Sequence, residues 1–427
     1  MTTETLISAE EEARRLDAED PLSGFRDRFL LPQNAEGEPL VYLCGHSLGL
    51  QPAGVKESID EVLDKWARRG VHGHFEEPRP FYSYHEALTA DMAALVGALP
   101  EEVVMMNSLT INLHLLMVSF YRPSMDRFKI LVEHEAFPSD RFALDSQIKY
   151  HGYDPRTAKI LLKPRDGEDT VRTEDILALI NREGRRIALV MLGGVNYVTG
   201  QALDMGAIAA AARRMGCIVG FDIAHAVGNI PLKLHDWDVD FAVWCSYKYL
   251  NSGPGSVGGA FVNQRHARRT DVPRLAGWWG HDPASRFAHM PEFSPQPGAA
   301  GWQVSNAPVL SMAACRASLA VFAEAGMTAL RAKSERLTDA LLDWLAAAPE
   351  GSLQIITPAD PAARGCQISF RVTRGDAKEL HAALLTDGFV CDYREPATIR
   401  VAAVPLYNTF HEVWRFAQAV CAKLAEA

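Results

Sequence analysis

Several features that would assign this chain to a specialised class of protein are missing from its sequence. The cysteines form no Cys-x-x-Cys pair and are scattered along the chain: Cys44, Cys217, Cys245, Cys315, Cys366, Cys391 and Cys421. This pattern argues against a disulfide framework or a zinc site, and it favours reduced thiols in a cytoplasm. No apolar run is long enough to cross a bilayer, and the acidic first twenty residues contain no apolar signal-peptide core.

Positive charge is also scarce. The 43 Lys and Arg residues are outnumbered by 53 Asp and Glu, which gives a net charge of -10, and no basic block interrupts the chain. We therefore expect neither nucleic acid nor an anionic membrane as a partner. No internal repeat or low-complexity segment is visible. With 427 residues, 48% of them hydrophobic, the chain is long enough for two or three domains.

From about residue 85 onward, short apolar runs alternate with amphipathic stretches. The apolar runs are EEVVMMN, FKILVEH, IALVMLGGV, CIVGFDIA, FAVWCSY and GGAFVN, and the helical stretches include TEDILALINRE and DMGAIAAAARRMG. Runs of this kind are typical of strands buried on both faces, and their alternation with helices predicts a mostly parallel, helix-covered sheet. A long helical stretch is expected over about 310–345, followed by three further strands and two helices.

This order of elements predicts three parts. An N-terminal segment, 1–70, is expected to pack with a small domain. A large α/β domain spans 71–310 and carries the mostly parallel sheet. A smaller C-terminal α/β domain spans 311–427, with strands at LQIIT, CQISFRV and TIRVAA.

Ligands of open α/β sheets bind beyond the carboxyl ends of the strands, so the polar residues at those ends are candidate site residues. Asp222 ends the run CIVGFD, and His225 follows three residues later. Lys248, preceded by Tyr247, ends the run FAVWCSYK, 26 residues after Asp222. Taken alone, an aspartate at a strand end is a helix cap or a salt-bridge partner about as often as it is a site residue. A single lysine is usually a solvated surface group.

Two further strand ends add to this pattern. Ser108 to Thr110 open the helix INLHLLMVSF, and EAFPSD supplies Phe137 and Asp140. A helix cap and a turn would each explain these residues separately. Together, the four strand ends offer an amine, a carboxylate, an aromatic ring and a helix N-terminus. Pyridoxal 5'-phosphate needs these groups for its aldehyde, its pyridine nitrogen, its ring face and its phosphate.

A literal match to the dinucleotide fingerprint, Gly-x-Gly-x-x-Gly, occurs at Gly253, Gly255 and Gly258. Pro254 lies within it, and the strand-like GGAFV follows where a helix is required. The context of a nucleotide-binding turn is therefore missing. We interpret the glycines instead as a sharp turn past a bound cofactor, where side chains would collide.

Nine motifs in this order resemble those of the kynureninases, which are fold-type-I pyridoxal-phosphate enzymes. The resemblance extends from about residue 40 to 415. The motifs are SLGLQP (47–52), NSLTINLHLL (107–116), EAFPSD (135–140), GGVNYVTGQ (193–201), GFDIAHAVGN (220–229), CSYKYLNSGPGSVGG (245–259), AGWWGH (276–281), VSNAPVL (304–310) and IRVAAVPLYNTF (399–410).

The resemblance implies a role for each matching position. Lys248 would bind the cofactor covalently and act in catalysis with Tyr247, and Arg400 would bind the substrate carboxylate. Trp278 and Asn306 would come from a neighbouring subunit, which implies a homodimer with shared sites. The implied cofactor-binding residues are Leu109, Thr110, Phe137, Pro138, Ser139, Asp140, Asp222, His225, Tyr247, Lys248, Trp278 and Asn306. At Gly193, where the family commonly has a hydroxyl-bearing residue, one hydrogen bond to the cofactor region would be missing or supplied by water.

The implied reaction is hydrolytic cleavage of the Cβ–Cγ bond of kynurenine or 3-hydroxykynurenine, giving L-alanine and an anthranilate. Members that prefer the 3-hydroxylated substrate tend to have His, Ser and Asn where others have Trp, Gly and Thr, and this chain has His74, Ser305 and Asn306. We therefore expect 3-hydroxykynurenine to be preferred. The alternatives are a cysteine desulfurase or aminotransferase of the same fold, and a non-catalytic cofactor-binding module.

Overall fold

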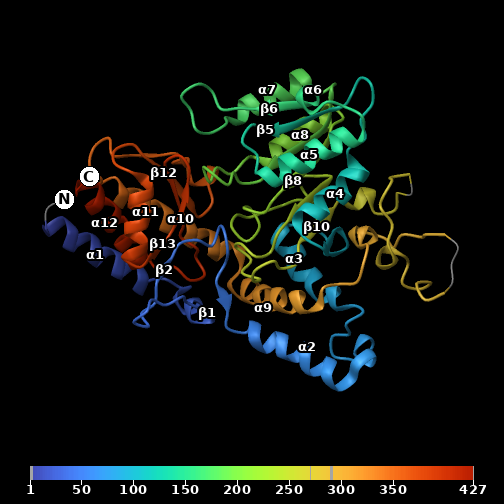
Figure 1. Cartoon of the computed structure of the whole chain (residues 1–427), viewed down its shortest axis with the longest axis horizontal. Coiled ribbons are helices and arrows are strands. Elements are labelled where there is room, and N and C mark those ends of the chain that lie inside the picture. Colours follow the sequence, from blue (N-terminus) through green and yellow to red (C-terminus); the bar gives the residue numbers. More distant parts are fainter. Residues whose placement is uncertain (1–2, 270, 289–291, 427) are drawn as a thin grey trace.

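The computed structural model describes residues 3–269, 271–288 and 292–426. Figure 1 shows a larger lobe built around a central sheet and a smaller lobe that holds both chain termini. The central sheet has seven strands in the order β4-β10-β9-β8-β7-β5-β6. Neighbouring strands from β9 to β6 are parallel, whereas β10 is antiparallel to both β9 and β4. The strands are β4 Val103–Met105, β5 Lys129–Glu133, β6 Lys159–Leu162, β7 Ile187–Gly193, β8 Ile218–Asp222, β9 Phe241–Trp244 and β10 Gly259–Val262.

Helices cover both faces of this sheet, as the unbroken apolar runs predict. In β9, Phe241 and Val243 pack on the face covered by α4 and α5, while Ala242 and Trp244 pack on the face covered by α3, α7, α8 and α9. All four side chains are inaccessible to solvent. The covering helices are α3 Thr89–Val96, α4 Leu109–Phe120, α5 Pro138–Tyr150, α6 Pro155–Ala158, α7 Thr173–Glu183, α8 Met205–Arg214 and α9 Val309–Ala325.

The smaller lobe is built around an antiparallel sheet in the order β11-β12-β15-β14. Its core is a separate cluster that includes Leu337 and Leu341 of α10 and Phe416 of α12. Its elements are α10 Met327–Leu345, β11 Leu353–Ile355, β12 Gln367–Val372, α11 Ala377–Thr386, β13 Phe389–Val390, β14 Asp392–Arg394, β15 Thr398–Ala402 and α12 Phe410–Glu426.

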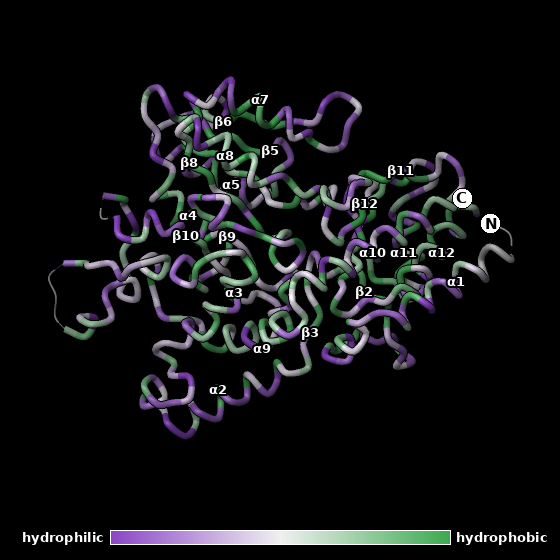
Figure 2. The backbone as a smooth tube through the Cα atoms, turned by 180° about the vertical axis from the view of Figure 1, so that it is seen from behind, coloured by the Kyte–Doolittle hydropathy of each residue, from purple (hydrophilic) through white to green (hydrophobic). Residues whose placement is uncertain are grey.

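The N-terminal segment contacts both lobes. Its first helix packs on α12, and β2 pairs in parallel with β13 of the smaller lobe. Its second helix, α2, packs instead on α9 and carries mostly hydrophilic residues along the rim in Figure 2. The elements are α1 Thr3–Ala18, β1 Phe29–Leu30, β2 Val41–Tyr42, β3 Gln51–Pro52 and α2 Val55–Arg69.

Two local expectations are corrected by the structure. The helical stretch predicted over 310–345 is two helices, α9 and α10, because Gly326 between them has a φ of 73° that ends the first. Buried residues of α9 belong to the core of the larger lobe, as does Leu330 in the first turn of α10. From Leu337 onward, the buried apolar residues of α10 belong to the core of the smaller lobe. The other correction concerns Lys248, which lies in a turn four residues beyond the end of β9 at Trp244, and not at the end of the strand itself.

Within the described part of the chain, no single helix is long and apolar enough to cross a membrane. The only combination of sufficient length and composition is α9 with α10, which are bent by 81° relative to each other.

Candidate active site

A cavity of about 120 Å³ lies beyond the carboxyl ends of β5, β7, β8 and β9, as expected for an open α/β sheet. Residues predicted from the four strand ends meet in it. The lining residues are Leu109, Thr110, Glu133, Phe137, Ser139, Asp140, Gly193, Val195, Asn196, Tyr197, Asp222, Ala224, His225, Tyr247 and Lys248. Pro138, also predicted, opens helix α5 beside them.

Two helices begin at this cavity, α4 at Leu109 and α5 at Pro138. The hydroxyl oxygens of Thr110 and Ser139, one from each helix, lie 2.7 Å apart. The first backbone N–H groups of a helix have no partner within the helix, and the helix dipole favours an anion there. The converging helix ends and the two hydroxyls therefore form a suitable cradle for a phosphate group.

The glycine-rich turn after Lys248 packs against the backbone that leads into this cradle. A Cβ atom on Gly258 would lie 2.9 Å from the carbonyl carbon of Ser108, directly before α4. Gly253 and Gly255 have φ values of 90° and 65°, in the left-handed region that favours glycine. The prediction of a sharp turn is confirmed. The close approach at Gly258, however, is to the backbone that precedes the phosphate cradle.

Asp222 and Asp140 lie together in the cavity. Burial raises the pKa of both carboxyl groups, and the charge of Asp222 raises that of Asp140 further. Asp222 Oδ1 accepts a hydrogen bond of 2.7 Å from the Ala224 backbone N–H. The buried Asp140 Oδ1 has no hydrogen-bond partner among the described residues. A buried pair with an unused acceptor is suited to bind a protonated ring nitrogen.

Lys248 and two aromatic residues, Phe137 and Tyr247, also line the cavity. The Lys248 Nζ atom lies 5.7 Å from the centroid of the Phe137 ring, which is 43% exposed. Tyr247 also lines the cavity, and burial raises the pKa of its hydroxyl group. The imidazole of His225 is buried, its Nδ1 atom has no partner among the described residues, and burial together with the charge of Lys248 lowers its pKa well below the usual value. His225 is therefore neutral and free to bond to a ligand.

Arg400 reaches this region from the smaller lobe on β15. Its side chain is buried, its Nε atom donates to Asp392 Oδ2 at 2.6 Å, and its Nη1 atom donates to the backbone carbonyl of Tyr197. Burial alone would raise the pKa of Asp392, but His46 and Arg400 hold that pKa well below its usual range. The guanidinium is thus fixed beside Tyr197, whose ring packs edge-to-face against Phe137 at 5.3 Å.

Three polar lining residues, Glu133, Asn196 and Tyr197, were missed in the sequence, as were the apolar Val195 and Ala224. Glu133 ends β5, and its Oε2 and Oε1 atoms accept hydrogen bonds of 3.0 Å from the Gly193 N–H and the Asn196 side chain. The carboxyl group of Glu133 fills the space beside Gly193, where a Cβ atom would lie 3.0 Å from Oε2. Asn196 and Tyr197 belong to the GGVNYVTGQ motif. The polar residue at the end of FKILVE was a usable signal for Glu133, since the segment that follows the same strand supplied Phe137 and Asp140.

Besides Pro138 and Arg400, four predicted residues do not line this cavity within one chain. Ser305 and Asn306 are exposed, Trp278 is 50% exposed, and the His74 ring packs edge-to-face against Phe81 at 5.9 Å. None of these four is among the cavity-lining residues. The assignment of Trp278 and Asn306 to the site of a neighbouring chain, and of His74, Ser305 and Asn306 to the substrate ring, remains a prediction.

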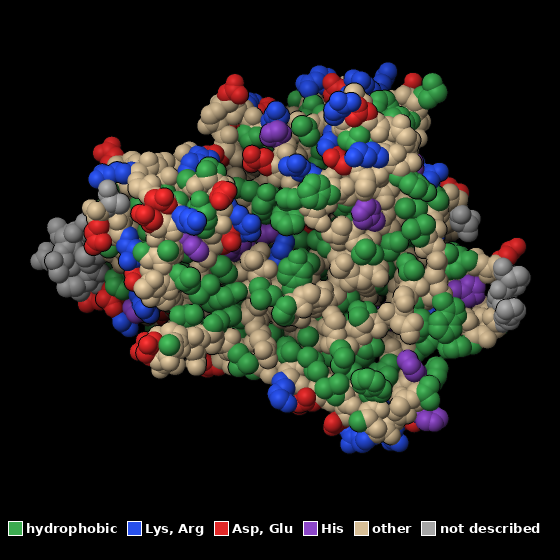
Figure 3. Space-filling view, in the orientation of Figure 1, with side chains coloured by type: hydrophobic (Ala, Val, Ile, Leu, Met, Phe, Trp, Pro, Cys, Tyr) green, Lys and Arg blue, Asp and Glu red, His purple; other side chains and the backbone are tan. Residues whose placement is uncertain are grey.

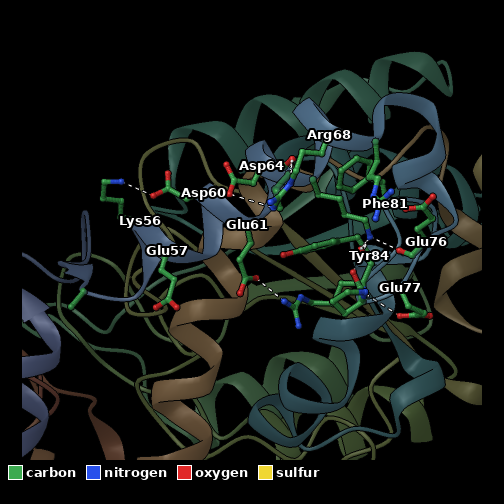
Figure 4. Close-up of a pocket in the computed structure, with 16 residues that line it drawn as sticks. Lys56, Glu57, Asp60, Glu61, Asp64, Arg68, Glu76, Glu77, Phe81 and Tyr84 are labelled. Carbon is green, nitrogen blue, oxygen red and sulfur yellow. Dashed lines mark hydrogen bonds and ion pairs between the residues drawn. The ribbon is translucent and has the colours of Figure 1, made fainter.

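Larger grooves lie elsewhere on the surface. One of about 820 Å³ runs between α2 and the segment 76–84, as Figure 4 shows. Most of its charged side chains are paired with one another, for example Arg79 with Glu61 at 2.7 Å and Arg69 with Glu76 at 3.0 Å. Paired charges leave little to bind a ligand, and we place the active site at the smaller cavity.

The residues of the smaller cavity fit pyridoxal 5'-phosphate. A phosphate would be held by the N-termini of α4 and α5 with Thr110 and Ser139, and the ring by Phe137. The buried carboxyl pair of Asp222 and Asp140, in which one oxygen is unpartnered, suits the pyridine nitrogen. The amine of Lys248 lies within the same cavity.

Comparisons with known proteins agree with this geometry. A family described as the kynureninase C-terminal domain matches residues 330–420. The kynureninase of Myxococcus xanthus (strain DK1622) is 57% identical over 97% of this chain and 98% of its own length. The fold is also similar to that of the cysteine desulfurase CsdA from Escherichia coli, with a TM-score of 0.76, 18% identity, and coverage of 95% and 98% of the two chains. A C-DES variant with glycine covalently linked to its PLP cofactor gives a TM-score of 0.75 at 16% identity, covering 89% and 96%.

The desulfurase alternative does not fit the thiols of this chain. All seven cysteines are buried, and burial raises the pKa of both Cys366 and Cys391 to about 12. A desulfurase nucleophile must be an accessible thiolate, which burial of this kind prevents. The fold is that of the fold-type-I pyridoxal-phosphate enzymes, and identity of this extent over nearly the whole length shows that the chain belongs to the kynureninase family, pyridoxal-phosphate-dependent hydrolases of carbon–carbon bonds.

Proposed function

We propose that this chain hydrolyses the Cβ–Cγ bond of kynurenines, with a preference for 3-hydroxykynurenine. The observation that carries the proposal is the meeting of Lys248, the Asp140–Asp222 pair and a phosphate cradle in one cavity, with Arg400 bonded to the backbone carbonyl of Tyr197, which lines that cavity. L-alanine and 3-hydroxyanthranilate would be the products.

The chain's own residues would share the work as follows. When bound, pyridoxal 5'-phosphate supplies an electron sink for the bonds at the substrate's Cα and Cβ. Asp222, in contact with Asp140, keeps the pyridine nitrogen protonated. Lys248 Nζ receives and returns the proton of the substrate's Cα atom. Tyr247 is our candidate acid and base at the γ-carbonyl, where water adds before the carbon–carbon bond breaks.

Arg400 would bind the substrate's carboxylate. A guanidinium presents a planar fork of donors that matches a carboxylate, and its orientation here is set by Asp392 and the Tyr197 carbonyl. With the carboxylate end held by the smaller lobe, the side chain of the substrate would extend toward the cavity mouth.

The preference for 3-hydroxykynurenine rests on His74, Ser305 and Asn306. Ser305 and Asn306 are exposed. Polar groups of this kind around an aryl ring favour a hydroxylated substrate, because a plain ring would leave them unpaired.

We further propose that two chains form a homodimer with shared sites, in which Trp278 and Asn306 of one chain complete the cavity of the other. A groove of about 930 Å³ supports this, since it carries the exposed side chains of Leu30, Leu48 and Leu310 beside the glycine turn that follows Lys248. Figure 3 shows hydrophobic side chains gathered over the middle of one face, with charged side chains mostly toward its rim.

The buried free thiols suit a reducing compartment such as the cytoplasm.

Turnover of both kynurenines, with chromatographic identification of the products, tests the reaction. We expect kcat/KM for 3-hydroxykynurenine to exceed that for kynurenine by about tenfold or more. The triple variant His74→Trp, Ser305→Gly, Asn306→Thr should shift the ratio toward kynurenine. Lys248→Ala should abolish turnover. A wild-type ratio that favours kynurenine would refute the preference, and release of a keto acid with no anthranilate would refute the reaction.

Mixing inactive chains tests the shared sites. Lys248→Ala and Trp278→Ala chains, each first shown to be inactive alone, are unfolded and refolded together. The mixture should regain about a quarter of wild-type activity, since half the dimers would carry one intact site. No recovery in a mixture shown to contain hybrid dimers would contradict the sharing.

A further inference from the structure

Glu133 is a cavity carboxyl group with no part in the chemistry proposed above. It ends β5, and its two oxygens accept one hydrogen bond each, from the Gly193 N–H and from the Nδ2 atom of Asn196, both at 3.0 Å. Burial raises the pKa of this carboxyl group, and the two donors oppose that effect. A carboxylate is therefore the group that suits both donors at once.

The bond to Glu133 fixes the orientation of the Asn196 side-chain amide. With Nδ2 turned toward Glu133, Oδ1 accepts hydrogen bonds from the backbone N–H groups of Val198 and Thr199, each at 2.9 Å. The backbone of Asn196 also bonds to Gln201 and Gly200 at 2.8 and 2.9 Å. One side-chain amide thus closes the turn 196–201, in the same way as in other turns built on an asparagine.

The smaller lobe contacts the larger lobe at this turn through several hydrogen bonds. Gln367 Nε2 donates to the carbonyls of Tyr197 and Val198 at 3.1 and 3.2 Å, and the Thr357 hydroxyl donates to the Thr199 carbonyl at 2.5 Å. Arg400 donates to the same Tyr197 carbonyl. The position of that one carbonyl, which the turn sets, therefore helps to orient the guanidinium that we assign to the substrate carboxylate.

We propose that Glu133 is a positioning residue that acts on Arg400 through Asn196 and the Tyr197 carbonyl. In this way a residue of the larger lobe helps to orient the guanidinium of the smaller lobe that binds the substrate carboxylate. This inference rests on the proposed role of Arg400. Loss of the Glu133–Asn196 bond would leave the chemistry at Lys248 in place and would weaken the grip on the substrate.

Exchange of the donor and the acceptor tests the bond directly. Glu133→Gln can still accept from Gly193 but turns an amide N–H₂ group toward the Asn196 N–H₂ group. Asn196→Asp places two carboxylates face to face. The double variant Glu133→Gln, Asn196→Asp reverses the polarity of the bond and restores it, while the Oδ1 atom at position 196 keeps its role in the turn.

Two measurements are made on the single and double variants. Amide hydrogen exchange of the cofactor-free protein reports on the turn without any turnover, and we expect faster exchange over 197–202 in each single variant and restored protection in the double variant. Steady-state kinetics of the holoenzyme should show KM for 3-hydroxykynurenine raised about tenfold in the single variants, with kcat changed by less than about threefold, and KM restored in the double variant.

A matched control is Glu102→Gln, which alters another buried carboxylate that accepts from backbone N–H groups, those of Leu99 and Gln264, outside the cavity. It should lower stability and leave KM unchanged. If the unmodified chain is active, normal exchange and normal KM in Glu133→Gln would reject the inference, as would a double variant no better than the single ones. Absence of turnover in the unmodified chain would reject the proposed function itself, and with it the clamp.

Discussion

Buried carboxyl groups lie at both ends of the central sheet, and they differ in the number of donors they meet. At the amino end, Asp240 precedes β9, and its oxygens accept from the Val219 N–H at 2.8 Å, Arg265 at 2.7 Å and His266 at 2.8 Å. At the carboxyl end, Asp140 Oδ1 has no partner among the described residues, and its neighbour is a second carboxyl group, Asp222.

The difference separates structural acids from functional ones. A fully bonded buried carboxylate contributes to stability, and removing it leaves its donors unsatisfied. An underbonded pair such as Asp140 and Asp222 costs stability, since burial opposes ionisation and the like charges repel. The fold tolerates this cost at the end of the sheet where a cofactor would supply the missing partner.

The largest effect is expected at the amino end. Asp240→Asn should lower the free energy of unfolding by about 3 kcal/mol, because Arg265 and His266 lose the buried charge they bond to. Chemical denaturation measures the loss, and kcat/KM below the transition should stay near the wild-type value. The exposed Asp236→Asn is the control, with an expected change below about 0.5 kcal/mol. Equal losses of unfolding free energy in Asp240→Asn and Asp236→Asn would contradict the structural role of Asp240.

At the carboxyl end the sign is reversed in the cofactor-free protein. Burial raises the folded-state pKa of Asp140 above its unfolded value, so the folded state holds its proton to higher pH. Stability therefore falls as pH rises above about 4, the unfolded value, toward the raised pKa. Asp140→Asn should remove this loss and stabilise the apoprotein by about 1 kcal/mol at pH 8, with little gain at pH 4.

Denaturation of the apoprotein at both pH values measures this effect, and the cofactor-loaded protein serves as the comparison. A variant with the same pH dependence as the wild type would show that Asp140 is not strained in the empty cavity.

The smallest effect is expected at Gly193, which ends β7 and donates its backbone N–H to Glu133. A serine Cβ atom there would lie 3.0 Å from Glu133 Oε2 and would push that carboxyl group away by a few tenths of an ångström. Gly193→Ser should raise KM about threefold and lower the melting temperature by about 2–4 °C, in line with mild overpacking of a buried site. Gly24→Ser, which has open space around its Cβ position, is the control. A variant with unchanged KM would argue that Glu133 adapts without moving the turn.

Much of this site was predictable because strand ends in a parallel sheet converge. Asp222, Lys248, Thr110 and Phe137 each follow an apolar run, and all four line one cavity. The family resemblance is confirmed by the relatives, and the parallel order of the central strands by the structure. The division into parts at residues 70 and 310 stays a prediction. In the structure, α1 packs with the smaller lobe, whereas α2 and α9 pack with the larger one.

The remainder depended on contacts between segments far apart in the chain. By itself, the sequence determined the chemistry available, because residue types and their strand-end positions follow from local patterns. Only the tertiary structure decided that Glu133 bonds to Asn196, and that the turn after Asn196 anchors Arg400, 203 residues beyond Tyr197. Such pairings depend on which strands are neighbours and on how the smaller lobe packs, and no local pattern of residues encodes either.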